Sequence, residues 1–459
     1  MKILFVTVDA WRASHTSFPS RSSDAPAPYT PKIASLAESG TAFTQAVSHG
    51  PATPYAFPAL HTSSLPLSHG GYERIDDSRT LISEALSAAG WRCVGIHANP
   101  WLGERYGYAR GYDDYRDVGE FSLPLLDDVR EELIGRFGLD HPVYRGAQYL
   151  YRYAQKPLAA LGGGGTDEVA AARDAIDGAP DRTFVWVHLL TPHAPYTPER
   201  EYRELMDVPP FEGSATKLST RAQHDPDSLT AQERTAIRRL YAAAVRQADD
   251  EVGRIVDAAD EETLVVVSAD HGEALFEHGQ LGHEPALYDE LLRVPLVVRP
   301  PSGEPVATRS VDTQAQHVDV GPTLLDYAGV DAPGTWIGRS LRPRIEDEVD
   351  DDDALAIAEV SSTATTPGRI DPDALQIGVR TPRRKVIATP DGTVTGYDLL
   401  EDPGEVDGTV EPTGAGWDRL REALRNRLDE IDVDGAPERG RIDRDDETEQ
   451  RLRDLGYLE

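Results

Sequence analysis

The N-terminal region contains the segment KILFVTVD (Lys2–Asp9), and a similar segment, TLVVVSAD, occupies Thr263–Asp270. Each is rich in Val, Ile, Leu or Phe and ends on an aspartate. Apolar runs of this length are typical of strands that are buried on both faces, as in a parallel sheet covered by helices. Three more runs lie at Arg92–His97, Thr183–Leu190 and Val294–Val298. The sequence therefore predicts an α/β fold with a large, mostly parallel sheet sandwiched by helices.

The chain of 459 residues is long enough for one large and one smaller domain. An acidic run at 346–353 follows a Pro-containing segment and indicates a boundary near residue 345. We therefore expect a catalytic domain over 1–345 and a smaller α+β subdomain over 346–459, with strands at 376–380 and 385–389. Residues 113–181, rich in Tyr, Arg and Leu, are predicted to form a helical insertion or cap.

The charge of the chain restricts its partners. Acidic side chains outnumber basic ones by 79 to 46, and the formal net charge is −33. Such a surface disfavours nucleic acid and anionic membranes as partners. A small anionic substrate stays compatible, because a bound metal ion reverses the local field. Five lysines among so many carboxylates indicate a halophilic protein from a salt-rich cytosol, with an ordinary acidic enzyme as the alternative.

Cysteine content and hydropathy bear on the cellular location. Cys93 is the only cysteine, so no intrachain disulfide can form, which suits a reducing compartment. The apolar run at the N-terminus is short and is interrupted by Asp9, unlike a signal peptide. No stretch reaches the length that spans a membrane. We expect a cytoplasmic protein, and the sequence leaves its oligomeric state open.

Polar residues lie at or just past the ends of four predicted strands: Asp9, Asn99, His188 with His193, and Asp270 with His271. Because the ligand crevice of an open α/β sheet lies beyond the carboxyl ends of its strands, these distant residues can converge. Two aspartates and a histidine form a donor set for a divalent cation. An Asp at such a position, taken alone, is more often a helix cap than a metal ligand. The joint pattern favours one metal ion, which is Ca, Mg or Mn, with Zn also compatible.

The segment GPATPYAFPALHTSSLP (Gly50–Pro66) is a second candidate element. Thr53 followed by Pro54 is typical of a helix N-cap with proline at the first helical position. A helix starting there would direct backbone N–H groups and a positive dipole end at an anion. The sequence allows two alternative roles for Thr53. It only caps the helix, or its hydroxyl lies on the metal ion, where it can lose its proton near neutral pH and attack the substrate.

Three histidines are candidates for handling an anionic substrate. His188 and His193 occur in HLLTPHAPY, and His283 occurs in GQLGHEPALYDE. Imidazole titrates near neutral pH, so one ring can bind the anion and another can protonate the leaving oxygen. A lone histidine is more often structural, and His193, in a Pro-bracketed loop, is a better candidate than His188. We assign Asn99 and His188 to substrate binding, and Thr53, His193 and His283 to catalysis.

Taken together, five longer segments resemble the sulfatase family of the alkaline phosphatase superfamily. They are FVTVDAWRASH (Phe5–His15), TPKIASLAESGTAF (Thr30–Phe43), SADHGEALFEHGQLGH (Ser268–His283), HVDVGPTLLDYAGV (His317–Val330) and YDLLEDPGE from Tyr397. The likeness runs nearly from end to end, and the third and fourth segments are highly specific. The resemblance implies a metal ion held by Asp9, Asp270 and His271, with the nucleophile as a further ligand. It also implies that His193 contacts the substrate and that His283 faces the anion.

The nucleophile segment departs from the family signature, which is Cys or Ser followed by x-Pro-Ser-Arg and a Leu-x-Thr-Gly tail. Counting back from Leu60 and Thr62 places Thr53 at the nucleophile and Phe57 at the Arg. Threonine is not the residue that is converted to formylglycine, so the aldehyde-hydrate mechanism of sulfatases does not fit. A directly attacking Thr resembles the nucleotide pyrophosphatase/phosphodiesterase branch, whose second metal site has no clear match here.

The leading hypothesis is a metal-dependent hydrolase of sulfate, phosphate or phosphonate esters, in which Thr53 attacks. A transferase that passes the group to an alcohol is the alternative among enzymes. A catalytically silent member that binds sulfated or phosphorylated glycans is the alternative outside them. The altered nucleophile segment favours the silent member, whereas Asp9, Asp270, His271 and His193 favour the enzyme.

Overall fold

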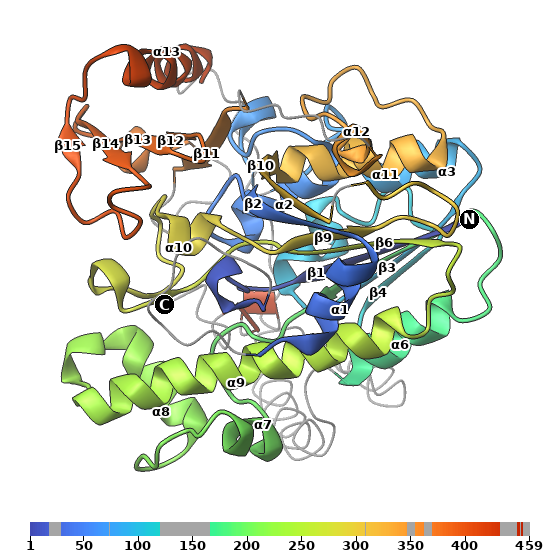
Figure 1. Cartoon of the computed structure of the whole chain (residues 1–459), viewed down its shortest axis with the longest axis horizontal. Helices are drawn as coiled ribbons and strands as arrows, with labels where there is room; N and C mark the ends of the chain where they lie inside the picture. Colours follow the sequence, from blue (N-terminus) through green and yellow to red (C-terminus); the bar gives the residue numbers. More distant parts are fainter. Residues whose placement is uncertain are drawn as a thin grey trace, which may run out of the picture.

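The computed structural model describes residues 1–17, 29–72, 74–119, 166–307, 309–346, 354–361, 370–431, 448–449 and 451–452. Figure 1 shows a large sheet between helical layers, with a smaller sheet beside it near the C-terminal end of the described chain. The predicted helical insertion at 113–181 lies mostly outside the described residues. Within that range, the structure describes strand β4 (Asp114–Asp117) and helix α6 (Thr166–Ile176).

The large sheet has eight strands. In spatial order they are β10 (Ser310–Gln316), β2 (Thr41–Val47), β9 (Leu296–Arg299), β6 (Thr263–Ala269), β1 (Lys2–Val8), β5 (Thr183–Leu189), β3 (Arg92–His97) and β4. β1 is central and pairs in parallel with β5 and β6. All seven residues of β5 and of β6 are buried, which explains their continuous apolar sequences. The predicted α/β sheet is confirmed.

β9 is an exception to the parallel arrangement. The sequence predicts this strand at Val294–Val298, among the runs typical of a parallel sheet. In the structure, β9 runs antiparallel to both β6 and β2. The connection from β6 to β9 contains the short helix α10 (Asp289–Leu292) and two two-residue strands, β7 (Ala274–Leu275) and β8 (Leu281–Gly282). It contains no crossover helix of the kind that would return the chain to the start of the sheet, so β9 runs in the opposite direction.

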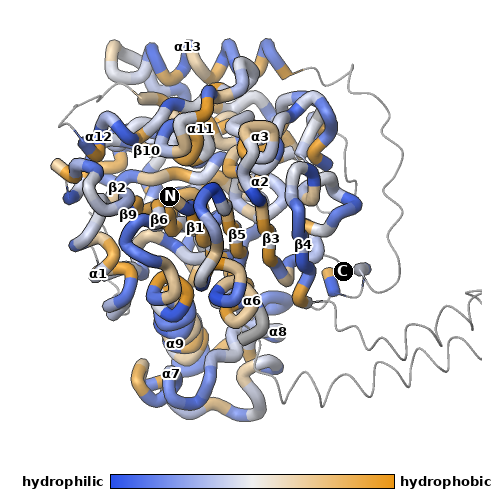
Figure 2. Tube along the Cα trace, turned by 90° about the vertical axis from the view of Figure 1, so that its right-hand side faces the viewer, coloured by the Kyte–Doolittle hydropathy of each residue, from blue (hydrophilic) through white to orange (hydrophobic). Residues whose placement is uncertain are grey.

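Helices cover both faces of the large sheet (Figures 1 and 2). On one face lie α1 (Pro31–Ser39), α6 and the long α9 (Ala231–Val256). On the other face lie α2 (Thr53–Thr62), α3 (Ile82–Ala88) and α11 (His317–Ala328). Figure 2 shows hydrophobic residues along the central strands, where these layers meet. None of the described helices combines the length and the apolarity needed to cross a lipid bilayer.

The small sheet has five antiparallel strands. They are β11 (Ala356–Val360), β12 (Gln376–Arg380), β13 (Arg384–Ala388), β14 (Val394–Asp398) and β15 (Thr409–Val410), and α13 (Ala415–Glu430) packs against them. The two strands that the sequence predicts here are β12 and β13, the second displaced by one residue. The domain boundary near residue 345 stays a prediction.

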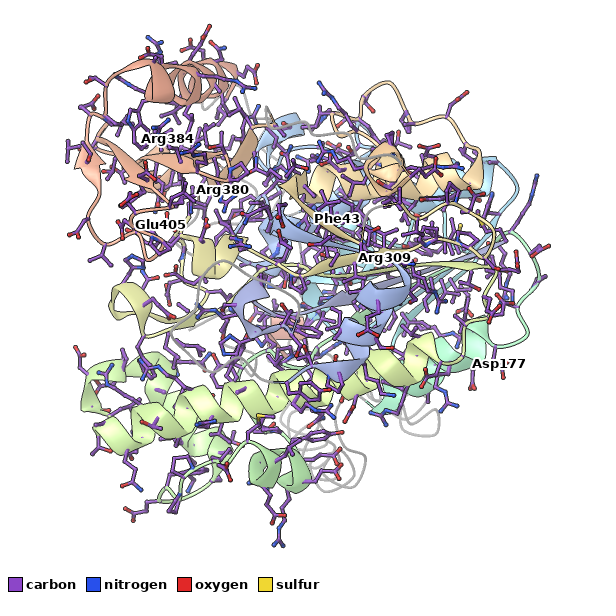
Figure 3. All side chains as sticks on the ribbon, viewed as in Figure 1. Phe43, Asp177, Arg309, Arg380, Arg384 and Glu405 are labelled. Atoms are coloured by element: carbon purple, nitrogen blue, oxygen red, sulfur yellow. The ribbon has the colours of Figure 1, made fainter. Side chains whose placement is uncertain are left out.

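A buried ionic network links the small sheet to α10. Lys385 is completely buried, and its Nζ lies 2.6 Å from Oδ1 of Asp289 and 2.8 Å from Oε1 of Glu405. Arg380 also pairs with Asp289, at 2.8 Å. Figure 3 shows Arg380 and Glu405 close to α10. Because α10 lies in the β6–β9 connection, the small sheet is joined to the segment that follows β6.

Candidate active site

The site begins where β1 and β6 end. Val8 pairs with Ala269 in the parallel register, so Asp9 and Asp270 are the first residues past two neighbouring strands. The carboxylate of Asp270 is fixed by backbone donors, because its Oδ1 accepts from the N–H of Ala10 at 3.1 Å and of His271 at 2.8 Å. The predicted convergence of Asp9 and Asp270 therefore follows from strand order and register.

His271 completes this cluster. Its Nε2 lies 3.5 Å from Oδ1 of Asp9 and 3.6 Å from Oδ2 of Asp270, and all three side chains are fully buried. Its Nδ1 lies 2.8 Å from the carbonyl oxygen of Gly272, which leaves Nε2 to face the carboxylates. Among the described residues, neither His271 Nε2 nor Asp9 Oδ1 has a hydrogen-bond partner. Buried polar atoms of this kind are normally paired or bound to a metal.

The electrostatics of the cluster also fit a cation. Burial, together with the neighbouring Asp9, raises the pKa of Asp270 well above its ordinary value. Burial opposes ionisation of Asp9 too, but His193, His188 and His271 outweigh it and lower the pKa of Asp9. Two carboxylates at such close range disfavour double ionisation unless a positive charge lies between them. The donor set of two carboxylates and one imidazole supplies a place for that charge.

Thr53 points into the cluster. Its Oγ1 donates a hydrogen bond to Oδ2 of Asp270 at 2.9 Å, and the side chain is fully buried. The prediction that Thr53 is the N-cap is wrong, because Ala52 occupies that position and Thr53 is the first residue of α2. Ala52 has extended backbone angles, and its carbonyl accepts from the N–H of Ala56 at 3.0 Å. The hydroxyl of Thr53 therefore meets Asp270 and caps no helix.

Asn99 lies between Asp9 and Thr53. Its Nδ2 donates to Oδ2 of Asp9 at 2.9 Å and to Oγ1 of Thr53 at 3.3 Å. Its Oδ1 accepts from the N–H of Trp101 at 3.0 Å, so the orientation of the amide is set by the backbone. The sequence predicts a substrate-binding role for Asn99. In the structure its contacts are with the proposed nucleophile and a proposed metal ligand.

His188 contacts Asp9. Its Nε2 is 3.4 Å from Oδ2 of Asp9, its Nδ1 is 3.0 Å from Oγ1 of Thr7, and it is fully buried. Phe57, which stands where the family signature has Arg, packs edge-on against His188 with ring centroids 4.9 Å apart. Phe57 also stacks on His61 at 5.3 Å. At this position the site therefore has an aromatic ring in place of a guanidinium charge.

His193 and His283 lie on another side of the cluster. The ring of His283 is 4.6 Å from that of His271 and 5.0 Å from that of His193, measured between centroids. Burial lowers the pKa of His193. Burial also acts against protonation of His283, but Glu273 outweighs it and raises the pKa of His283. The structure therefore brings all the predicted site residues into one region.

Glu273 lies in the same region, although the sequence does not predict it as a site residue. Its Oε2 lies 2.9 Å from Nδ1 of His283, and its Oε1 accepts from the hydroxyl of Tyr196. A possible signal was its position two residues after His271 in DHGE. That signal was weak, because a glutamate in a loop is ordinarily solvated, and only the fold shows this one to be completely buried.

The fold and the cluster together define an α/β protein with a set of potential metal ligands at the carboxyl ends of its central strands. Residues 2–330 match the family described as Sulfatase, and residues 277–434 match the one described as N-sulphoglucosamine sulphohydrolase, C-terminal. The first match covers more than half of the chain. The protein therefore belongs to the sulfatase family.

Individual relatives have low sequence identity to this chain or match only part of it. The uncharacterized sulfatase YidJ of Escherichia coli is 25% identical over 43% of this chain and 46% of its own length. The N-acetylglucosamine-6-O-sulfatase of Bacteroides thetaiotaomicron is 34% identical over 24% of this chain and 20% of its own. The chain thus matches less than half the length of these curated relatives. The crystal structure of a phosphonate monoester hydrolase from Agrobacterium radiobacter superposes with a TM-score of 0.65 at 19% identity, over 94% of this chain and 95% of that one.

Proposed function

We propose that the protein hydrolyses an anionic ester, with the hydroxyl of Thr53 as nucleophile and one divalent cation at the Asp9–Asp270–His271 cluster. The ester is one of sulfate, phosphate (mono- or diester) or phosphonate. The observation that carries the proposal is the position of Thr53 Oγ1, 2.9 Å from Asp270 Oδ2 inside the buried cluster. Membership of the sulfatase family supports the reaction class.

The residues of the cluster fit the cation. Asp9, Asp270 and His271 would hold it, with the hydroxyl of Thr53 beside them. Carboxylate oxygens suit Ca, Mg and Mn, and imidazole is compatible with Mn and Zn. When bound, the ion supplies positive charge that favours ionisation of a nearby hydroxyl and stabilises charge on the non-bridging oxygens of the substrate.

The side chains of the site account for the first displacement. The hydroxyl proton of Thr53 leaves along its hydrogen bond to Asp270 as Oγ1 forms a bond to phosphorus or sulfur. Asn99 donates to Oγ1 from another direction and so restricts the rotation of this side chain. We therefore assign Asn99 a positioning role. His188, held against Asp9 and Thr7, orients the carboxylate of Asp9 in the same way.

The bond to the leaving oxygen breaks with its electron pair on that oxygen. His283 or His193 then supplies a proton, and the product is a neutral alcohol. In a second displacement a water molecule attacks phosphorus or sulfur and gives a proton to that histidine. The bond to Oγ1 breaks, and Oγ1 of Thr53 takes back the proton from Asp270. As substrate we propose a small ester of a sulfated or phosphorylated sugar, since one relative is named for N-acetylglucosamine-6-O-sulfate and a structural neighbour for phosphonate monoesters.

The direct test compares Thr53→Ala and Asp270→Ala with the wild-type protein on p-nitrophenyl sulfate, phosphate, phosphodiester and phosphonate esters. Each assay contains Mn, Mg, Ca or Zn at high salt. We expect both variants to lose at least about 10³-fold in kcat/KM, because each removes a group that acts in the transition state. Thr62→Ala is the matched control, because Thr62 is equally buried at the other end of α2.

Two outcomes would contradict the proposed function. Turnover that persists in Asp270→Ala would contradict the metal mechanism. A wild-type protein that hydrolyses none of the esters and contains no stoichiometric metal would instead be a silent member that binds its ligand. Product analysis in the presence of an acceptor alcohol distinguishes hydrolysis from transfer to that alcohol.

A further inference from the structure

Glu273 is a buried carboxylate that none of the roles above uses. It is completely buried, and its two oxygens have different partners. Oε1 accepts from the hydroxyl of Tyr196, and Oε2 lies 2.9 Å from Nδ1 of His283. A buried carboxylate is normally hydrogen-bonded, and these two partners fix the orientation of this one.

The backbone around Glu273 is fixed on several sides. Its N–H donates to the carbonyl of Glu290 at 2.9 Å, and its own carbonyl accepts from Nη1 of Arg12 at 3.1 Å. The preceding Gly272 passes so close to this chain that a Cβ there would lie 2.0 Å from the carbonyl oxygen of Glu290. Tyr196 is also fully buried, and its N–H donates to Oγ of Ser219 at 3.1 Å. The carboxylate therefore has a rigid support.

This arrangement determines which edge of the imidazole faces the cluster. The two nitrogens of imidazole lie on opposite edges of the ring, and a carboxylate that accepts from Nδ1–H selects the tautomer and the ring orientation. With Nδ1 directed at Glu273, the ring presents its Nε2 edge to a ligand. The centroid of this ring lies 4.6 Å from that of His271, so His283 stands beside the catalytic cluster.

A second cation is the competing explanation, because His271, Glu273 and His283 also form a compact set of donor atoms. His271 Nδ1 is 2.8 Å from the carbonyl oxygen of Gly272, so only its Nε2 can bind a metal. That same Nε2 faces Asp9 and Asp270. One imidazole nitrogen has one lone pair and cannot serve two ions, so the contacts favour a hydrogen-bonded pair.

We propose that Glu273, supported by Tyr196, is a positioning residue that orients His283 to protonate the leaving oxygen. The inference rests on the proposed function and identifies which histidine acts. As Thr53 Oγ1 bonds to phosphorus or sulfur, the bond to the leaving oxygen breaks and its electron pair stays on that oxygen. The proton on His283 Nε2 moves to this oxygen and gives the alcohol. The imidazole keeps its Nδ1–H directed at Glu273.

The test uses two esters of the same acid group, one with p-nitrophenol and one with phenol as leaving group. The p-nitrophenolate ion leaves without a proton, whereas phenolate, a poorer leaving group, benefits from one. For Glu273→Ala we expect kcat/KM to fall about 10²-fold on the phenyl ester and less than about fivefold on the p-nitrophenyl ester. Glu273→Gln restores most of the loss, because its amide oxygen accepts the same N–H.

Controls separate this inference from the proposed function. His283→Gln should show the same dependence on the leaving group. If it shows none, the role of His283 in the proposed function is wrong and the inference falls with it. If His283→Gln shows the dependence but Glu273→Ala does not, only the inference is overturned. Glu251→Ala, which removes a buried glutamate from α9, should leave the ratio between the two esters unchanged.

Tyr196→Phe provides a second variant in case Glu273→Ala does not fold. It removes only the hydrogen bond to Oε1, and we expect a smaller loss of the same kind, about tenfold in kcat/KM on the phenyl ester. Two further results would overturn the inference: a Glu273→Gln protein no better than Glu273→Ala, and a wild-type protein that binds two metal ions where Glu273→Gln binds one.

Discussion

The contacts of the Asn99 amide distinguish two roles for this residue, substrate binding and orientation of the nucleophile. One nitrogen donates to both Asp9 and Thr53, and the amide oxygen is held by the N–H of Trp101. A residue that binds substrate affects KM, whereas one that orients the nucleophile affects kcat. The sequence placed Asn99 at the end of a strand, but its hydrogen-bond partners could be known only from the fold.

Asn99→Asp tests this distinction with almost no change in shape. The aspartate still accepts from Trp101, but an oxygen replaces the donor that faces Asp9 and Thr53. We expect kcat to fall about 10–100-fold with KM nearly unchanged. Steady-state kinetics with the best ester of the panel measures both, and metal content should be determined in parallel. A rise in KM with kcat preserved would return Asn99 to substrate binding.

Glu251 in α9 illustrates a buried acid outside the site. Burial raises the pKa of Glu251 to about 7, from an ordinary value of 4.5. Between these values the folded protein binds a proton that the unfolded chain has lost. The free energy of unfolding therefore falls as the pH rises through this window, and the penalty is complete above pH 7.

Glu251→Gln removes this penalty. We expect the variant to be more stable than the wild-type protein at pH 8 by about 1–3 kcal/mol, because a shift of one unit corresponds to about 1.4 kcal/mol. The difference should vanish only well below pH 4.5, where the glutamate is protonated in both the folded and the unfolded state. Urea unfolding of both proteins across this pH range measures it. A difference that does not change with pH would show that Glu251 ionises normally in the fold.

Among the elements, the strands with uninterrupted apolar sequences were predicted to within about two residues, as β1 and β3 show. β2 and β10 were missed, although they pair side by side in the large sheet. Both contain polar residues, and some of these make hydrogen bonds to residues distant in the sequence. Thr44 donates to Asp312 at 2.7 Å, and Gln314 donates to the carbonyl of Arg380 at 3.0 Å. These partners lie far along the chain, so a local pattern cannot anticipate them.

The candidate site likewise contains residues that can be predicted from the sequence and residues that cannot. Asp9 and Asp270 were predictable because each directly follows an apolar run, and strand order brings such residues together. The capping role of Thr53 was wrong because the sequence pattern does not distinguish the first residue of a helix from the one before it. Glu273 was missed because burial of a loop residue depends on the whole fold.

The network that joins β13 to α10 allows a prediction about an element contact. Lys385→Ala would leave the carboxylates of Asp289 and Glu405 buried without their shared cation. We expect a loss of about 3–5 kcal/mol in the free energy of unfolding, measured by urea denaturation. Arg200→Ala removes an exposed ion pair with Glu204 and should change stability by less than about 1 kcal/mol. Equal effects of the two substitutions would refute the importance of the network.

At the level of the whole molecule, the most prominent feature is the large negative net charge. A net charge of −33 causes self-repulsion in the compact state, and dissolved ions screen it. The screening length falls from about 10 Å at 0.1 M salt to about 3 Å at 1 M. Because this repulsion acts on the compact state, the free energy of unfolding should depend on the salt concentration.

We expect the midpoint of thermal unfolding to rise when KCl is increased from 0.1 to 2 M at pH 8. Differential scanning calorimetry provides the measurement. The increase should shrink as the pH approaches the pI of about 4.7, because the net charge to be screened disappears. A midpoint that is indifferent to KCl at pH 8 would exclude adaptation to a salt-rich cytosol.

The hydroxyl of Thr53, held by Asp270 at the start of α2, has a consequence for biosynthesis. Ribosomes incorporate threonine as it is, so a nucleophile of this kind needs no maturation enzyme and no oxygen to become reactive. If Thr53 is the nucleophile, as we propose, catalytic competence requires folding but no modifying partner, so protein made in a cell-free extract that lacks such an enzyme should be active once refolded in high salt.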